Sequence, residues 1–264
     1  RCSPTLEDVR FPLGAADILK RRAASWPARC PRPGSGCCRC SSAQPSGSRL
    51  HNTNQVIGMD GILNIDKPLG WTSHDVVAWV RRLLKVKRVG HAGTLDPLAT
   101  GVLLVCIGQA TRLSEYIMAS DKSYRAQIQL GTSTDSYDLD GEVVQVRPLP
   151  EGLNQETIGE ALAAFQGDLM QMPPIYSAIK QGGVALHRLA RRGESVQPQA
   201  RPVHIHRIEL VDWSPPVLTV NVTCSPGTYI RSLAHDLGEA LGCGGTLAGL
   251  RRTRSGAFSV DDAL

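Results

Sequence analysis

Over most of the chain, segments with a strand period and segments with a helix period follow one another in no regular order, and this most restricts the possible folds. Ile62–Ile65, Val102–Ile107 and Leu218–Cys224 have the length and apolar pattern of strands. Ile230–Leu241 carries an apolar stripe at helical spacing and ends at Gly242. A parallel sheet would need strands and helices in regular alternation. We therefore expect an α+β domain with helices flanking a mixed, mainly antiparallel sheet.

A capping box precedes the first expected helix. Thr72 and Asp75 have the spacing at which each side chain caps the other's backbone N–H, and the apolar residues of Val76–Leu84 follow at helical spacing. The alternation in Tyr124–Leu130 and Gly141–Val146 is typical of half-exposed strands. The remaining expected elements are a helix over Thr157–Phe165 and a strand over Arg201–Leu210.

Residues 1–58 differ in composition from the rest of the chain. They are rich in Pro, Gly, Ser, Arg and Cys, and they carry 9 basic and 3 acidic residues of the 29 and 24 in the whole chain. The net charge of +5 therefore comes from this segment. Its cysteines lack the paired spacing of structural zinc sites. We expect 1–58 to be a disordered or spurious extension before Met59, with a zinc knuckle and a transit peptide as the alternatives.

The composition excludes two broad classes of protein. With 42% hydrophobic and 20% charged residues, the chain can bury a substantial core, which excludes wholesale disorder. The longest apolar runs are too short to span a bilayer, and no secretory signal is apparent. Cys106, Cys224 and Cys243 stand apart in the sequence, which favours reduced, buried thiols over a disulfide framework. We therefore expect a cytoplasmic protein with no membrane partner.

The segment Gly90–Gly101 has the densest concentration of unusual residues in the chain. Its sequence Gly-His-Ala-Gly-Thr-Leu-Asp-Pro-Leu-Ala-Thr-Gly places three glycines and a proline around one carboxylate, Asp96. Glycines allow close backbone approach, and a residue before proline is restricted to extended geometry. The pattern therefore predicts a rigid loop that fixes the direction of Asp96. The alternative is that Asp96 is an ordinary helix N-cap before Pro97.

Arg231 and Tyr124 are two further candidates for function. Arg231 falls in the first turn of an expected helix, where a cation opposes the helix dipole, so a buried carboxylate or a phosphate is needed to explain it. The alternative is an Arg side chain in solvent. Tyr124 has Lys122 and Arg125 as neighbours, which suits a platform for a nucleobase, but an ordinary strand tyrosine fits as well.

Three local basic clusters favour a polyanionic partner although the chain after residue 58 is close to neutral. They are Arg81–Arg88, Arg188–Arg192 and Arg251–Arg254, and we expect the first and third to contact phosphates. Ser136–Gly141 resembles a calcium loop, but Arg147 occupies the position of the required glutamate. No zinc-protease, P-loop, dinucleotide or hydrolase motif is present.

Six motifs, in order, resemble those of the TruB family of tRNA pseudouridine-55 synthases. The resemblance covers nearly everything from residue 60 to residue 258. The motifs are the Lys-Pro-Leu-Gly-Trp-Thr-Ser region of Gly61–Ser73, the loop Gly90–Gly101, Asp121–Arg125, Pro173–Lys180, Gly227–Leu233 and the segment from Leu250 to Phe258.

The resemblance implies the pseudouridine synthase fold, with a cleft across the sheet, and catalysis by the domain 59–264. The implied reaction is the isomerisation of one uridine in the T-arm loop of tRNA, position 55, with no cofactor and no metal. Asp96 matches the catalytic aspartate, Tyr124 the residue that stacks on the target base, and Arg231 the ion-pair partner of the aspartate.

The resemblance also implies further substrate contacts. His91 matches a histidine that takes the place of the flipped base, while Tyr229 and Leu250, like Tyr124, match residues that touch the target uridine. Three features depart from the family pattern. Pro226 replaces a frequent basic residue, and His187 stands where an aromatic residue is usual. A C-terminal RNA-binding domain, usual in bacterial members, is expected to be absent, with a truncated sequence as the alternative.

The T-arm stem-loop of tRNA is thus the expected partner, and the protein is expected to act as a monomer without an obligate protein partner. One alternative is the guide-RNA-dependent branch of the family, which commonly has Lys-Val where this chain has Leu98-Ala99. The other is a non-enzymatic RNA-binding or tRNA-folding protein, which the presence of Asp96, Tyr124 and Arg231 argues against.

Overall fold

The computed structural model describes residues 59–177, 180–181, 184–185 and 198–264. The expected extension at 1–58 and the basic cluster Arg188–Arg192 lie outside these residues. The strands are β1 (Gly61–Lys67), β2 (Val89–Ala92), β3 (Ala99–Ile107), β4 (Lys122–Leu130), β5 (Thr132–Thr134), β6 (Val143–Val146), β7 (Gly167–Gln171), β8 (Lys180–Gln181), β9 (Val184–Ala185), β10 (Arg201–Ser214), β11 (Val217–Cys224), β12 (Gly245–Ser255) and β13 (Phe258–Ser259). The helices are α2 (Ser73–Leu84), α3 (Ser114–Met118), α4 (Gln155–Ala163) and α6 (Ile230–Ala240), with 3₁₀ turns at Gly108–Leu113 and Val260–Asp262.

The main sheet has the order β1-β3-β12-β4-β11-β10-β7, with β2 paired to β3 and β13 paired to β12. Its pairings are antiparallel except that of β12 with β3, which is parallel. The expectation of an α+β domain with a mixed, mainly antiparallel sheet is confirmed. The two neighbours of β12 are β3 and β4, which follow one another in the chain, so β12 lies between two strands that are consecutive in the sequence.

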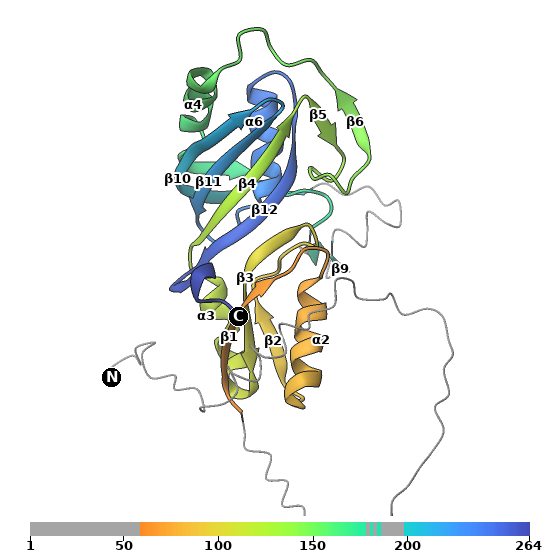
Figure 1. Ribbon diagram of the computed structural model, residues 1–264, viewed down its shortest axis with the longest axis vertical. Helices are drawn as coiled ribbons and strands as arrows, with labels where there is room; N and C mark the ends of the chain where they lie inside the picture. The colour runs from red at the N-terminus through yellow and green to blue at the C-terminus, as the bar shows by residue number, and fades with distance from the viewer. Residues whose placement is uncertain (1–58, 178–179, 182–183, 186–197) are drawn as a thin grey trace, which may run out of the picture.

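Strand β12 joins the two halves of the molecule (Figure 1). One half contains β4, β10 and β11 with α4 and α6, and the other contains β1, β2 and β3 with α2. β12 pairs with β3 only over Leu250–Arg252, whereas it follows β4 over most of its length. The register with β4 is interrupted between Leu247 and Gly249 and again between Arg252 and Arg254.

The described residues form three apolar cores. The largest packs α4 and α6 against β4, β10, β11 and β12, and the second packs α2 against β1 and β3. The third lies on the other side of β1 and β3, against α3. Leu250 is the residue that contacts both the first and the second core. Burial of these apolar faces is the main force that holds each helix on the sheet. The functional residues expected from the sequence lie where the two halves meet at β12.

The ends of two helices agree with the sequence analysis. The Thr72 side chain accepts from the Asp75 N–H and the Asp75 side chain accepts from the Thr72 N–H, so the expected capping box is confirmed. Tyr229 is the N-cap of α6, which places Arg231 in the first turn as expected. The half-exposed alternation expected for Gly141–Val146 is wrong, because all four residues of β6 are exposed. β6 pairs only with the short β5, so neither of its faces is covered by a core.

Candidate active site

Asp96 lies in the loop between β2 and β3, and the loop is fixed to the start of α2. The Ser73 hydroxyl donates to the Leu95 carbonyl (3.0 Å) and accepts from the Leu95 N–H (2.8 Å). The Leu95 side chain is buried in the second core. Asp96 caps no helix, since its carbonyl closes a turn with the Ala99 N–H that leads into β3. The Asp96 side chain is 46% exposed, so its carboxylate faces the cleft from a rigid support.

The guanidinium of Arg231 joins two carboxylates. Its Nη2 lies 3.2 Å from Oδ2 of Asp96, and its Nη1 lies 3.2 Å from Oδ2 of Asp138. Two backbone carbonyls, of Ser136 (3.3 Å) and Tyr176 (3.0 Å), accept further hydrogen bonds from it. The Arg231 side chain is only 9% exposed. The structure therefore brings together Asp96 and Arg231 as expected, and the unusual cation in the first turn of α6 is explained by acidic partners.

Asp138 is a member of the site that the sequence analysis did not identify. Its side chain is 8% exposed, and its Oδ1 accepts from the Ser136 hydroxyl (2.6 Å) and the Asp140 N–H (3.2 Å). The loop that carries it was considered only as a calcium site. The available signal was the clustering of Ser and Asp residues in 135–140, which is typical of a loop built on side-chain to backbone hydrogen bonds.

Tyr124 and Tyr229 lie close to the charge of Asp96. Burial raises the pKa of both phenols, and the Asp96 charge adds to this increase. The charge of the Arg252 guanidinium opposes the increase at Tyr124. The buried side-chain amide of Gln171 holds the Tyr229 backbone, donating to its carbonyl (3.0 Å) and accepting from its N–H (2.8 Å). Both tyrosines therefore face the same region as Asp96.

His91 and Leu250 occupy the margins of this region. His91, on β2, meets the ring of His74 edge to face with ring centroids 5.3 Å apart. Burial lowers the pKa of His91, and the nearby His74 and Arg252 lower it further. Leu250 sits opposite Ala99 of β3 and Ala126 of β4, between the two halves of the sheet. The structure thus places Leu250 between the two halves of the sheet and His91 beside α2.

Lys67 is a second buried group that the sequence analysis did not single out. Its ammonium donates to the carbonyls of Trp71 (2.6 Å) and Pro68 (2.9 Å) at the end of β1. Burial lowers the pKa of Lys67 to about 8, and the Asp96 charge is the largest opposing influence. Lys67 therefore supports the turn that leads into α2, on which the Asp96 loop rests.

The expectation of a phosphate contact is wrong for Arg252, because this residue is 2% exposed. For Arg251 it stays a prediction, since its side chain is 42% exposed although it forms a two-point ion pair with Asp66 (2.7 and 3.2 Å). Successive side chains of a strand point to opposite faces, so the two residues lie on different sides of the sheet. In Arg81–Arg88, by contrast, most of the basic side chains are exposed.

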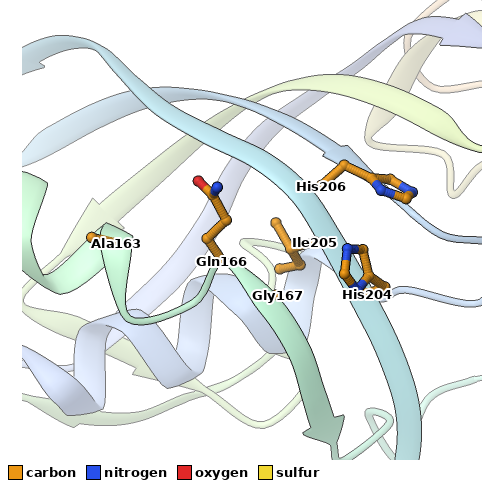
Figure 2. Close-up of a pocket in the computed structure, with 6 residues that line it drawn as sticks. All are labelled: Ala163, Gln166, Gly167, His204, Ile205 and His206. Carbon is orange, nitrogen blue, oxygen red and sulfur yellow. The ribbon is translucent and has the colours of Figure 1, made fainter.

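The described residues include no group of three or more His, Cys, Asp and Glu side chains placed to hold a metal ion. Figure 2 shows a depression beside β10, lined by Ala163, Gln166, Gly167, His204, Ile205 and His206. Both histidines are paired with carboxylates, His204 with Asp168 (2.7 Å) and His206 with Asp121 (3.2 Å). None of the expected site residues lines this depression, so the candidate active site is the region around Asp96. In the described part of the chain, no helix is long and apolar enough to cross a membrane.

Two family models match the chain in succession. Residues 81–230 match the TruB family pseudouridylate synthase (N terminal domain), and residues 231–264 match the tRNA pseudouridylate synthase B C-terminal domain. The chain is 51% identical over 213 residues to tRNA pseudouridine synthase B of Heliobacterium modesticaldum, covering 80% of this chain and 69% of the relative. It is 49% identical over 206 residues to the enzyme of the same name from Opitutus terrae, covering 78% of this chain and 85% of the relative.

Solved structures show the same fold. A chain in the crystal structure of a Cbf5-Nop10-Gar1 complex aligns with a TM-score of 0.59 and 34% identity. A chain in the structure of an H/ACA RNP bound to a substrate RNA containing 2′-deoxyuridine aligns with a TM-score of 0.57 and 30% identity. The alignments cover 75% and 77% of this chain, which spans about half the length of those two chains.

Proposed function

The chain belongs to the TruB family of pseudouridylate synthases, and from this we propose that it converts uridine 55 in the T-arm loop of tRNA to pseudouridine. The observation that carries the assignment of roles is the position of Arg231, whose guanidinium lies 3.2 Å from Asp96 and 3.2 Å from Asp138. This buried bridge holds one half-exposed carboxylate at a fixed place in the cleft. A fixed carboxylate is the group that the reaction requires.

The reaction exchanges a carbon–nitrogen bond for a carbon–carbon bond. The bond from C1′ to N1 of uracil breaks, the base turns without leaving, C5 bonds to C1′, and the proton released from C5 is balanced by one gained at N1. Two roles are open to Asp96. Its carboxylate can attack C1′ as a nucleophile, or it can remove the 2′ proton to give a glycal. Neither route consumes another reactant.

The residues around Asp96 suit the binding of an extruded base. An enzyme that acts on a base inside a folded loop must take it out of the stack and hold it between apolar or aromatic surfaces. We assign Tyr124 to stacking on the base and Tyr229 and Leu250 to further contacts with it. His91 would fill the space that the base leaves. These roles are supported by the family membership and by the proximity of both tyrosines to the charge of Asp96.

The proposed substrate is tRNA alone, without a guide RNA. The relatives with about 50% identity are named as tRNA enzymes, whereas the chains from ribonucleoprotein complexes are 34% and 30% identical. The exposed basic side chains of Arg81–Arg88 would supply contacts to phosphate. That the enzyme acts as a monomer stays a prediction, which sedimentation at assay concentrations checks.

The decisive experiment measures tritium release from 5-tritiated uridine in a T-arm stem-loop. The chain alone should release tritium from position 55. A stem-loop with cytidine at this position should not be a substrate. Release only when a guide RNA or a further protein is added would favour the guide-dependent branch. RNA binding without any release would favour a protein that folds tRNA but does not modify it.

A further inference from the structure

Arg252 is a buried cation that has no acidic partner in the described part of the chain. It is 2% exposed and is the largest fully buried side chain. The ion pairs among the described residues involve other arginines: Arg147, Arg207, Arg231 and Arg251. Removing a charge from water is costly unless the charge is paired, so buried arginines are normally found with carboxylates. A buried guanidinium without one calls for an explanation beyond stability.

Arg252 lies next to three parts of the candidate active site. Its Nε donates to the Val102 carbonyl of β3 (2.7 Å), and its Nη2 donates to the Gly93 carbonyl (3.0 Å). Gly93 directly follows β2, in the loop that carries Asp96. The third part is Tyr124, which lies directly opposite Arg252 in the register of β4 and β12. The planar fork of a guanidinium is suited to holding several acceptors in fixed directions.

Two glycines of the Gly90–Gly101 segment lie next to Arg252. Gly93 has φ +94°, and a Cβ there would lie 3.5 Å from Nη1 of Arg252, which is an ordinary contact, so the backbone conformation is what requires glycine. Gly101 has φ +96°, and a Cβ there would overlap the backbone carbonyl oxygen of Arg252. The two glycines therefore allow the backbones of the Asp96 loop and β3 to lie close to β12 at Arg252.

We infer that Arg252 is a positioning residue, which sets the Asp96 loop and Tyr124 at the separation that the target base requires. This inference rests on the proposed function. Arg252 acts through Gly93 and Tyr124 and needs no contact with the RNA. If Arg252 had a purely structural role, its replacement would lower the stability of the fold or the affinity for tRNA. If it has a positioning role, its replacement lowers the rate of the chemical step. Misplacing a reacting group by about 1 Å can cost about 100-fold in rate.

The test compares Arg252→Met with Arg251→Met. Methionine retains the length and apolar stem of arginine, and replacing a buried charge by an apolar side chain is often neutral or stabilising, so the variant should fold. With saturating enzyme, Arg252→Met should lower the single-turnover rate constant by about 100-fold. The dissociation constant for the T-arm stem-loop should change by less than about threefold, which is under 1 kcal/mol. Arg251→Met, which loses only the Asp66 pair on the opposite face, should keep the wild-type rate constant.

A double-mutant cycle with Tyr124→Phe separates positioning from an independent effect. Loss of the Tyr124 hydroxyl should lower the single-turnover rate constant much less in the Arg252→Met background than in the wild type, because the two groups act together. Additive effects would contradict an action through Tyr124. Should Arg252→Met not fold, Arg252→Lys replaces it. One ammonium cannot hold the two carbonyl acceptors in the same geometry, so the same rate loss is expected.

The failures of the two proposals can be told apart. A wild-type chain that releases no tritium from the stem-loop refutes the proposed function. Wild-type turnover together with an equally fast Arg252→Met or Arg252→Lys variant overturns the positioning role alone. A loss of affinity that matches the whole loss of rate also overturns it, because the residue would then only support binding.

Discussion

Replacing Asp138 by asparagine removes one of the two carboxylates that hold Arg231. The amide oxygen can still accept from the Ser136 hydroxyl and the Asp140 N–H, which now bond to Oδ1 of Asp138. The amide nitrogen then faces Nη1 of Arg231, where a carboxylate oxygen lay at 3.2 Å. Two donors oppose each other inside a nearly closed site, and the guanidinium keeps only the half-exposed Asp96 as a charged partner.

The expected loss of stability follows from this geometry. Removing one partner of a buried ion pair costs about 3–5 kcal/mol, and we expect about 3 kcal/mol because Asp96 still compensates Arg231. The expected loss of rate is about 100-fold, since Arg231 turns away from the place where it supports Asp96. Denaturant unfolding measures the first quantity, and single-turnover tritium release measures the second.

Asp140→Asn is the matched control for this prediction. Asp140 belongs to the same loop, and its side chain is exposed. Its replacement should change the free energy of unfolding by less than about 0.5 kcal/mol and leave the rate unchanged. If Asp138→Asn were as stable and as fast as Asp140→Asn, the bridge through Arg231 would have no energetic role and the reasoning would be refuted.

Four further predictions concern the catalytic carboxylate, the extension, Lys67 and the RNA surface. Asp96→Ala and Asp96→Asn should abolish turnover while leaving tRNA binding nearly intact; appreciable tritium release by either would contradict the assignment. A chain that begins at Met59 should fold and turn over like the full chain, and aggregation or a zinc-dependent loss of activity would show that the preceding residues belong to the domain. Burial lowers the pKa of Lys67 from 10.5 to about 8. The charged ammonium therefore destabilises the fold fully below pH 8, and this destabilisation disappears as the pH rises to 10.5. The free energy of unfolding of Lys67→Met relative to the wild type should fall by about 3 kcal/mol over that range, and a difference independent of pH would refute this. Charge removal at Arg82 and Lys85 should flatten the slope of log K for the stem-loop against log salt by about one to two units without changing the single-turnover rate constant, and an unchanged slope would mean that these side chains do not reach phosphate.

The parts of the site that could be read from the sequence are those in which local geometry is decisive. The capping box at Thr72 and Asp75 depends on residues three apart, and the structure contains it. The rigid loop around Asp96 follows from glycine and proline within one short segment. Arg231 needed an acidic or phosphate partner because of its place in a helix, and such a partner is present. In each case the signal lies within one short segment of the chain, although the partner of Arg231 comes from a distant loop.

The parts that escaped prediction depend on contacts between distant segments. Asp138 reaches Arg231 across 93 residues, and no local pattern specifies that meeting. The cluster Arg251–Arg254 was expected to contact phosphates, because a run of charges does not reveal that its strand will lie between β3 and β4. Once β12 is central, the two-residue period directs Arg252 into the interior and Arg251 toward Asp66.

The two register irregularities in β12 lie on either side of the stretch that joins the two halves of the molecule. Between them, Leu250–Arg252 is paired with both β3 and β4. A strand divided in this way absorbs an added or deleted residue at either outer part, because each bulge is a place where the count of paired residues already changes. The outer parts of the strand can therefore change in length while Leu250 and Arg252 keep their alignment. The geometry of the candidate active site then does not depend on the size of the surrounding sheet.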